Sequence, residues 1–156
     1  MRYVIATLIT LLLSVSVGCS DDTDVDYEPL PGPIILKPAF IKSESVAPEY
    51  DPYVLIETQY VWLGCCSEIV ISRDTPSEHG PVSVRVLGVT VQTYFDSMAP
   101  GEVWLRLPRI PFDYGLNIAY EEFTDNYQVH VDESLLVITP IERHFTIIHD
   151  TLAQVP

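Results

Sequence analysis

The dominant pattern along the chain is an alternation of apolar and polar residues with a period of two. In the segment PVSVRVL, Val82, Val84 and Val86 alternate with Ser83 and Arg85. Successive side chains of a β-strand point to opposite faces, so this segment predicts a strand with the three valines on its buried face.

A second segment, YVLIETQYVW, alternates in the same way and predicts another strand. Glu57 and Gln59 are expected on its polar face. The predicted apolar face carries Val54, Ile56, Tyr60 and Trp62.

After Gly88 the apolar phase moves by one residue, to Val89 and Val91, which predicts a bulge or a tight reversal at the glycine. Further short strands are expected over residues 68–72, 103–107, 116–120, 127–131, 135–138 and 144–149.

Turn signals separate these strands, among them DTPSEHGP, SMAPGE, PRIPFDYG and FTDN, and no segment has sustained helical spacing. Roughly seven to nine short strands with this punctuation predict an all-β fold, specifically an antiparallel, immunoglobulin-like β-sandwich. A small β-barrel is the alternative.

The first residues follow a different pattern. Arg2 gives a short positive start, and residues 4–17 are almost all apolar. This run is shorter than the roughly 20 apolar residues of a membrane-spanning helix. Small residues at Ser16 and Gly18 precede a cleavage point after Gly18, so residues 1–18 are predicted to be a cleaved signal peptide.

The stretch LLSVSVGC resembles the leader of bacterial lipoproteins, in which the peptide before an invariant cysteine is removed and that cysteine carries the lipid. The resemblance implies lipidation of Cys19 and anchoring in the bacterial outer membrane. Ser16 stands where the pattern has leucine, which leaves ordinary secretion with a free Cys19 thiol as the alternative.

The hexapeptide CSDDTD resembles the acidic export signal that follows the lipidated cysteine in surface lipoproteins of one Gram-negative phylum. This resemblance favours the cell surface over the periplasmic face. A solvated tether is the alternative interpretation of the same residues.

Asp22, Asp24 and Asp26 also have the spacing that opens a calcium-binding loop. An EF-hand needs glycine at the sixth position and glutamate at the twelfth, where this chain has Tyr27 and Pro33. No metal site is therefore predicted here.

Prolines 29, 31, 33 and 38 stiffen the following residues toward the extended polyproline conformation. Residues 19–38 are accordingly assigned to a lipidated tether and residues 39–156 to the β domain, with Ile34 as the alternative start of the domain.

The formal net charge of −14 excludes nucleic acid and anionic lipid surfaces as partners, because both would repel the protein. Contact with a membrane is expected through the acyl chain on Cys19 alone.

Cys65 and Cys66 are adjacent, and three interpretations of the pair stay open. Neighbouring Cα atoms lie about 3.8 Å apart across a trans peptide, whereas disulfides span about 4.4–6.8 Å, so a vicinal disulfide would be strained. It could form a rigid apolar knuckle at a ligand site. The alternatives are ordinary packing of two thiols, and metal binding or intermolecular pairing.

The histidines give no catalytic signature, since neither HExxH nor GxSxG occurs. His130 is expected to face solvent, and His144 and His149 should point to opposite faces of a strand. The sequence therefore predicts no catalytic residue, no cofactor and no metal.

Aromatic residues near predicted strand ends are the candidate ligand contacts: Tyr94, Trp104, Tyr114 and Tyr120. Flat amphipathic rings suit recognition of glycan or protein, while packing within the core is the alternative role.

Together these features predict a lipid-anchored, non-enzymatic binding or adhesion module of the bacterial cell envelope that engages protein or glycan through sandwich loops. One alternative is a periplasm-facing structural subunit of an outer-membrane assembly. An uncharacterised enzyme is another.

Overall fold

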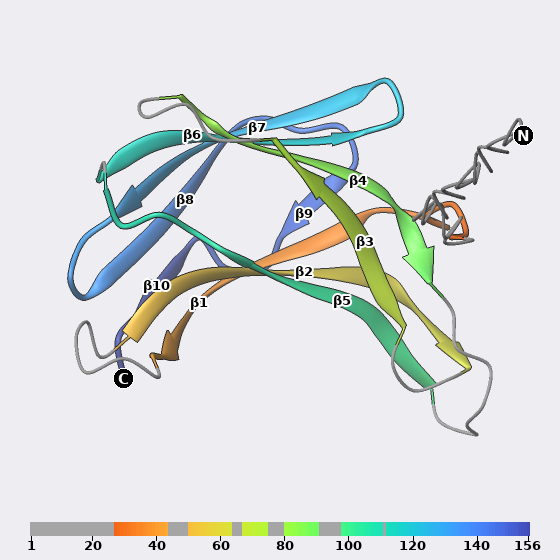
Figure 1. Ribbon diagram of the computed structural model, residues 1–156, viewed down its shortest axis with the longest axis horizontal. Coiled ribbons are helices and arrows are strands. Elements are labelled where there is room, and N and C mark those ends of the chain that lie inside the picture. Colours follow the sequence, from red (N-terminus) through yellow and green to blue (C-terminus); the bar gives the residue numbers. More distant parts are fainter. Residues whose placement is uncertain (1–26, 44–49, 64–66, 75–79, 91–97, 111) are drawn as a thin grey trace, which may run out of the picture.

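A computed structural model describes residues 27–43, 50–63, 67–74, 80–90, 98–110 and 112–156. Within these ranges the chain forms ten strands and no helix, which confirms the all-β prediction (Figure 1). The strands are β1 (Ile34–Lys42), β2 (Tyr50–Leu63), β3 (Glu68–Arg73), β4 (Val82–Thr90), β5 (Met98–Arg106), β6 (Asp113–Tyr120), β7 (Phe123–Val131), β8 (Leu135–Glu142), β9 (Thr146–Ile148) and β10 (Leu152–Gln154).

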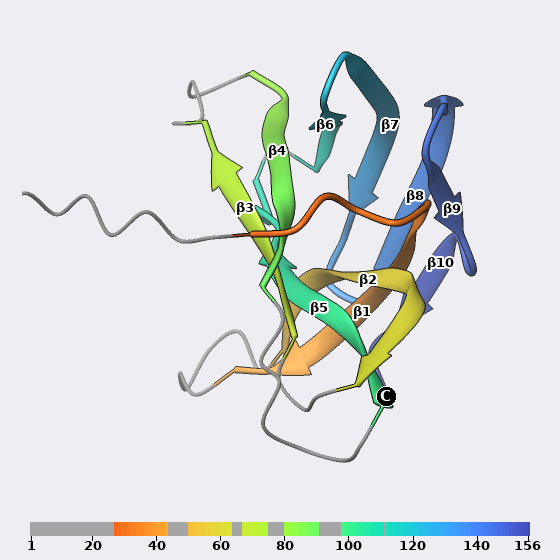
Figure 2. The ribbon, with the colours of Figure 1, turned by 90° about the vertical axis from the view of Figure 1, so that its right-hand side faces the viewer.

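The strands belong to one hydrogen-bonded sheet with the order β10-β8-β7-β6-β4-β3-β5-β2-β1-β9. The sheet curls into a half-barrel in which β1, β2 and β5 lie across from β6, β7 and β8 (Figures 1 and 2). The sheet is mixed, because three of its strand pairs are parallel: β1 with β9, β3 with β5, and β4 with β6. The prediction of a purely antiparallel sheet is therefore wrong: these parallel pairs join segments that are not neighbours in sequence.

The alternating valines of β4 lie where the sequence placed them. Val82, Val84 and Val86 are buried, whereas Arg85 is exposed. They pack in one core with buried residues of β1, β2, β6, β7 and β8. Burial of these apolar side chains inside the curl is the main favourable term for folding.

The prediction for β2 is correct at its start and wrong further along. Val54 and Ile56 are fully buried, but Tyr60 is 53% exposed. The pairing of β2 with β5 shifts register between Glu57 and Val61. Between these two residues β2 advances by four positions while β5 advances by two, from Glu102 to Pro100. Two extra residues of β2 therefore bulge out of the pairing, and Tyr60 points to solvent instead of the core.

The irregularity predicted at Gly88 is confirmed. The register of β4 against β3 shifts at this point, and Gly88 has a φ of +153°. An added Cβ would lie 2.4 Å from the backbone oxygen of Glu28. Glycine thus lets the backbone of Glu28 approach, and Glu28 and Val89 exchange two backbone hydrogen bonds of 2.8 and 2.9 Å.

The folded domain begins earlier than residue 39. Ile34 and Leu36, which the sequence assigned to the tether, are fully buried in the core as part of β1. Proline did not prevent this strand: Pro33 precedes it, and Pro38 lies beyond Leu36, where the pairing with β9 ends. The predicted signal peptide and the first part of the tether lie outside the described residues.

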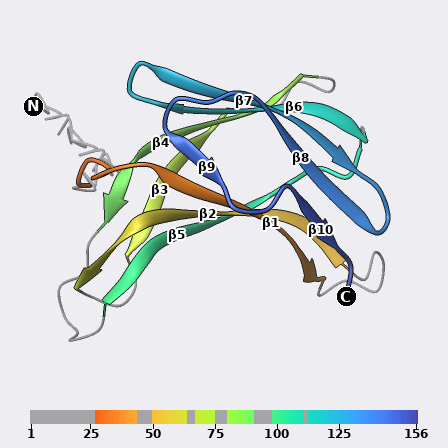
Figure 3. The ribbon, with the colours of Figure 1, turned by 180° about the vertical axis from the view of Figure 1, so that it is seen from behind.

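The last strands contact both ends of the curled sheet. β9 pairs with β1, and β10 pairs with β8 (Figure 3). In the short link between them, the backbone N–H of His149 donates to Leu36 O at 3.3 Å, and Thr151 O accepts from the N–H of Ile138 at 2.9 Å. Residues 146–154 therefore tie β1 to β8.

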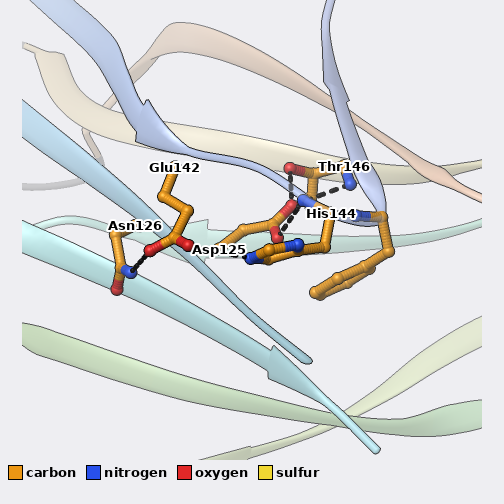
Figure 4. Close-up of polar contacts among 6 residues, drawn as sticks. Asp125, Asn126, Glu142, His144 and Thr146 are labelled. Atoms are coloured by element: carbon orange, nitrogen blue, oxygen red, sulfur yellow. Dashed lines mark hydrogen bonds and ion pairs between the residues drawn. The ribbon is translucent and has the colours of Figure 1, made fainter. Parts of the chain in front are cut away.

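A buried carboxylate holds the turn that leads into β9 (Figure 4). Asp125 on β7 is fully buried. Its Oδ1 accepts from the N–H of His144 at 2.6 Å, while its Oδ2 accepts from the N–H groups of Phe145 at 3.3 Å and Thr146 at 2.8 Å. The Thr146 hydroxyl also donates to Asp125 and is bonded to the Tyr127 hydroxyl. These donors offset the cost of burying a charge.

Among the described residues, no helix is long and apolar enough to cross a membrane.

Replacing Asp125 with asparagine should lower the free energy of unfolding by roughly 2–4 kcal/mol, because an amide offers only one oxygen to four donors. Urea unfolding followed by circular dichroism measures the change. Asp113→Asn, at an exposed position, is the matched control and should cost less than about 1 kcal/mol. Equal losses in the two variants would contradict the structural role of Asp125.

Stability should fall at alkaline pH. Burial raises the pKa of Tyr127 to about 12, above the value of about 10 in an unfolded chain. The neutral phenol is favoured in the folded state, so its contribution is complete below about pH 10 and is lost as the pH rises toward 12. Urea unfolding between pH 8 and 12 should show this loss, and a smaller loss for Tyr127→Phe. Tyr60→Phe, at an exposed position, should show the wild-type decrease of the unfolding free energy with pH.

Candidate functional site

One candidate site lies on the outer face of β5. Glu102, Trp104 and Arg106 are exposed, whereas Leu105 between them is buried. Strand periodicity places these three side chains on the same face. Trp104 is 44% exposed, and its ring lies edge to face against Tyr53 of β2, with ring centroids 6.4 Å apart. Tyr53 thereby supports an indole ring that stays open to solvent.

Trp104 lines a groove with a volume of about 590 Å³. β3 and β5 pair at Glu68 and Glu102 and then diverge (Figure 1), and the groove lies where they meet. Its other lining residues are Ser67, Glu68, Ile69, Ala99, Pro100, Glu102 and Val103.

Two carboxylates of the groove, Glu68 and Glu102, are exposed, and one hydroxyl, that of Ser67, is buried in its wall. Ser67 is 2% exposed, and its hydroxyl has no hydrogen-bond partner among the described residues. Within the same ranges Glu68 and Glu102 form no ion pair. Because the Ser67 hydroxyl is buried, the lining side chains that a ligand in the groove can reach are Trp104 and the two carboxylates.

This combination suits binding of a small polar molecule. The indole offers a flat apolar surface, and the carboxylates accept hydrogen bonds from hydroxyl or amine groups. The volume lies within the range of about 300–1,000 Å³ typical of small-molecule sites.

The structure does not bring the predicted ligand-contact aromatics together. Tyr114 is buried, its hydroxyl donates to Pro108 O at 3.0 Å, and burial raises its pKa. The Tyr120 hydroxyl accepts from the N–H of Leu30 at 2.9 Å, and its ring packs 5.8 Å from that of Phe145. Tyr114 is therefore a packing residue, whereas Tyr120 is half-buried and lines a separate pocket of about 320 Å³. Trp104 is the exposed candidate among the predicted aromatics that the structure describes.

Tyr94 and the cysteines Cys19, Cys65 and Cys66 lie outside the described residues. The predictions of lipidation and of a vicinal disulfide therefore stay predictions. In sequence, Ser67 directly follows the cysteine pair.

The three histidines that the structure describes lie on the surface. His130 Nδ1 is 2.9 Å from Asp113 Oδ1, and His144 Nε2 is 3.2 Å from Glu142 Oε1. His149 is exposed as well.

The cluster around Asp125 combines a carboxylate with hydroxyl groups, but Thr146 is only 6% exposed and Tyr127 is fully buried. A substrate could not reach the Thr146 hydroxyl, so this cluster stabilises the fold. In the part of the chain that the structure describes, no group of three or more His, Cys, Asp or Glu side chains could hold a metal.

A second pocket, of about 340 Å³, lies at the far end of β5. It is lined by Asp51, Arg73, Arg106, Leu107, Pro108 and Arg109. Arg106 Nη2 is 2.8 Å from Asp51 Oδ2, and Arg109 Nε is 3.8 Å from Asp51 Oδ1.

Sequence reasoning missed most of the residues that line the groove and the arginine pocket. The segment EVWLR, residues 102–106, shows the outward spacing of Glu102, Trp104 and Arg106. Ser67 and Arg73 enter their pockets through tertiary contacts between β3 and β5, which no local pattern reveals.

The chain matches no protein-family model, no curated protein and no solved structure.

Proposed function

We propose that the protein is a non-enzymatic binding module that recognises a glycan in the groove beside Trp104. The observation that carries this proposal is the exposed Trp104 ring in a groove that also holds two exposed carboxylates, Glu68 and Glu102, neither of which forms an ion pair with any described residue. The contact surface is thus the outer face of β5 and its junction with β3, in place of the sandwich loops expected from sequence.

The size of the groove favours a sugar over a protein partner. A stable protein interface buries about 800 Å² on each side, whereas a groove of about 590 Å³ fits a few sugar rings. A sugar presents an apolar face to an aromatic ring and hydroxyl groups at its edges. Glu68 and Glu102 are placed to accept hydrogen bonds from such hydroxyls.

We class the fold as a small, partly open barrel in preference to an immunoglobulin-like sandwich. Two observations support this choice. The strands follow a single hydrogen-bonded order, and residues 146–154 contact both β1 and β8.

The proposed location of the protein is the outer face of the bacterial outer membrane. Its support is the resemblance of residues 1–19 to a lipoprotein leader and of CSDDTD to an acidic export signal. In this proposal an acyl chain on Cys19 holds the acidic domain at the membrane. A periplasm-facing accessory subunit is the alternative.

Trp104→Ala should abolish or weaken glycan binding by roughly tenfold or more, because a central exposed aromatic residue commonly carries much of the binding energy. An oligosaccharide array, followed by calorimetry on each sugar that binds, measures the effect. Phe112→Ala removes another exposed aromatic side chain, outside the groove, and should bind as wild type does. Lack of any bound sugar, or equal binding by the two variants, would contradict the proposed function.

The natively produced protein should begin at Cys19 and carry the added mass of fatty acyl groups. Intact-mass measurement of the protein from its membrane fraction tests this. Cys19→Ser should yield a chain without the acyl mass. Detection of Met1 on the wild-type protein would contradict the anchor. Protease treatment of intact cells then separates the two faces, since only a surface domain would be digested.

A further inference from the structure

The second pocket concentrates positive charge in an acidic protein. Arg73, Arg106 and Arg109 are three of the eight basic residues in a chain with a net charge of −14. Asp51 is the one acidic residue that lines this pocket within the described part of the chain. Three guanidinium groups therefore face one carboxylate.

Stabilisation of Asp51 does not account for all three arginines. Asp51 is 6% exposed, and Arg106 alone gives it a close ion pair of 2.8 Å. Arg109 is more distant at 3.8 Å. Arg73, at the end of β3, forms no ion pair with any described residue.

Arg109 also has an unused donor. Its Nε is buried and has no hydrogen-bond partner among the described residues. Asp51 at 3.8 Å thus leaves the charge of this guanidinium only partly compensated, and the Arg109 side chain as a whole is 25% exposed, so an anion in the pocket can approach it. Guanidinium groups bind carboxylate, sulfate and phosphate oxygens with paired hydrogen bonds.

The pocket and the proposed sugar-binding face are joined by one strand, β5. Arg106 lies two residues beyond Trp104 on the same face of β5, a separation of about 7 Å. Glu102 lies at an equal distance on the other side. Along β5 the outward side chains are therefore the negative Glu102, then the aromatic Trp104, then the positive Arg106.

We propose that the ligand is an acidic glycan, which stacks one sugar ring on Trp104 and places a carboxylate or sulfate group among Arg73, Arg106 and Arg109. The sugar hydroxyls at the other edge of the ring donate to Glu102 and Glu68. The sugar part of this inference rests on the proposed function, whereas the anion pocket rests on the arginines. Because the net charge of the protein repels anions, binding depends on these local contacts.

The anion pocket can be tested without a sugar. Sodium sulfate is titrated into the isotope-labelled protein at constant ionic strength, and the side-chain Nε–H signals of arginine are followed by NMR. The Arg109 signal should shift and saturate. Arg73→Gln should weaken sulfate binding by about fivefold or more, because it removes one charged donor while leaving Asp51 paired with Arg106.

Arg85→Gln, an exposed strand arginine outside the pocket, is the matched control and should bind sulfate as wild type does. The pocket assignment is overturned if the Arg109 shift does not saturate, or if Arg73→Gln and Arg85→Gln behave alike.

The acidic-glycan assignment is tested with matched pairs of probes. Trigalacturonic acid is compared with its methyl ester, and a sulfated galactan oligosaccharide with its desulfated form, by calorimetry. One charged member should bind about tenfold more tightly than its neutral partner, and which pair shows this identifies carboxylate or sulfate. Trp104→Ala should weaken both members of that pair, whereas Arg73→Gln should reduce only the preference for charge.

The two proposals fail in different ways. Trp104-dependent binding that is equal for charged and neutral members would overturn the acidic-glycan inference and leave the glycan function standing. Sulfate binding through Arg73, with no sugar dependent on Trp104, would overturn the glycan function and leave the anion pocket standing. Absence of both would overturn the whole inference.

Discussion

Asp125 is buried on β7 and accepts hydrogen bonds from three consecutive backbone amides and one hydroxyl of the segment that enters β9 (Figure 4). Charge-assisted hydrogen bonds of this kind are stronger than neutral ones, and a buried carboxylate has no water to replace them. The segment is therefore fixed against β7, which directs β9 along β1 and, after a short link, β10 along β8. The curl of the sheet and the enclosed core depend on this placement.

The curl also creates the candidate binding face. β3 and β5 belong to portions of the sheet that bend away from each other, so they share a single pair of residues and then diverge. One groove lies where they meet and contains Ser67, Glu68 and Trp104, and the arginine pocket lies toward their other ends. β5 runs from the groove to the arginine pocket, and its outward side chains line both. The divergence of β3 from β5 thus places carboxylates, an indole ring and guanidinium groups on one surface.

Local patterns predicted the parts of the fold that depend on local geometry. Alternation in β4 identified its buried valines, and the phase change at Gly88 identified the irregularity beside Val89. The same argument placed Tyr60 in the core, because the register shift in β2 depends on its pairing with β5. β1 was missed because its prolines favoured a tether, although Ile34 and Leu36 are buried by strands distant in sequence.

The candidate site was predictable to a smaller extent. Trp104 was among the aromatic candidates, and the spacing of Glu102 and Arg106 around it can be read in the sequence. Tyr114 and Tyr120 have equally suggestive positions, but Tyr114 is buried and Tyr120 is half-buried, since exposure depends on what the rest of the chain covers. Ser67 and Arg73 join the site through β3, and that proximity is set by the tertiary fold alone.

The pairing of β1 with β9 has a consequence for how the protein is made. Ribosomes deliver the chain from its N-terminus, so Ile34 and its neighbours emerge long before Thr146 and Ile148 exist to pair with them. Until then one edge of β1 lacks its partner, and the core it covers cannot be sealed. Contacts so distant in sequence slow folding. The growing polypeptide should therefore remain unfolded, and dependent on protection from aggregation, until residues 146–148 have been synthesised.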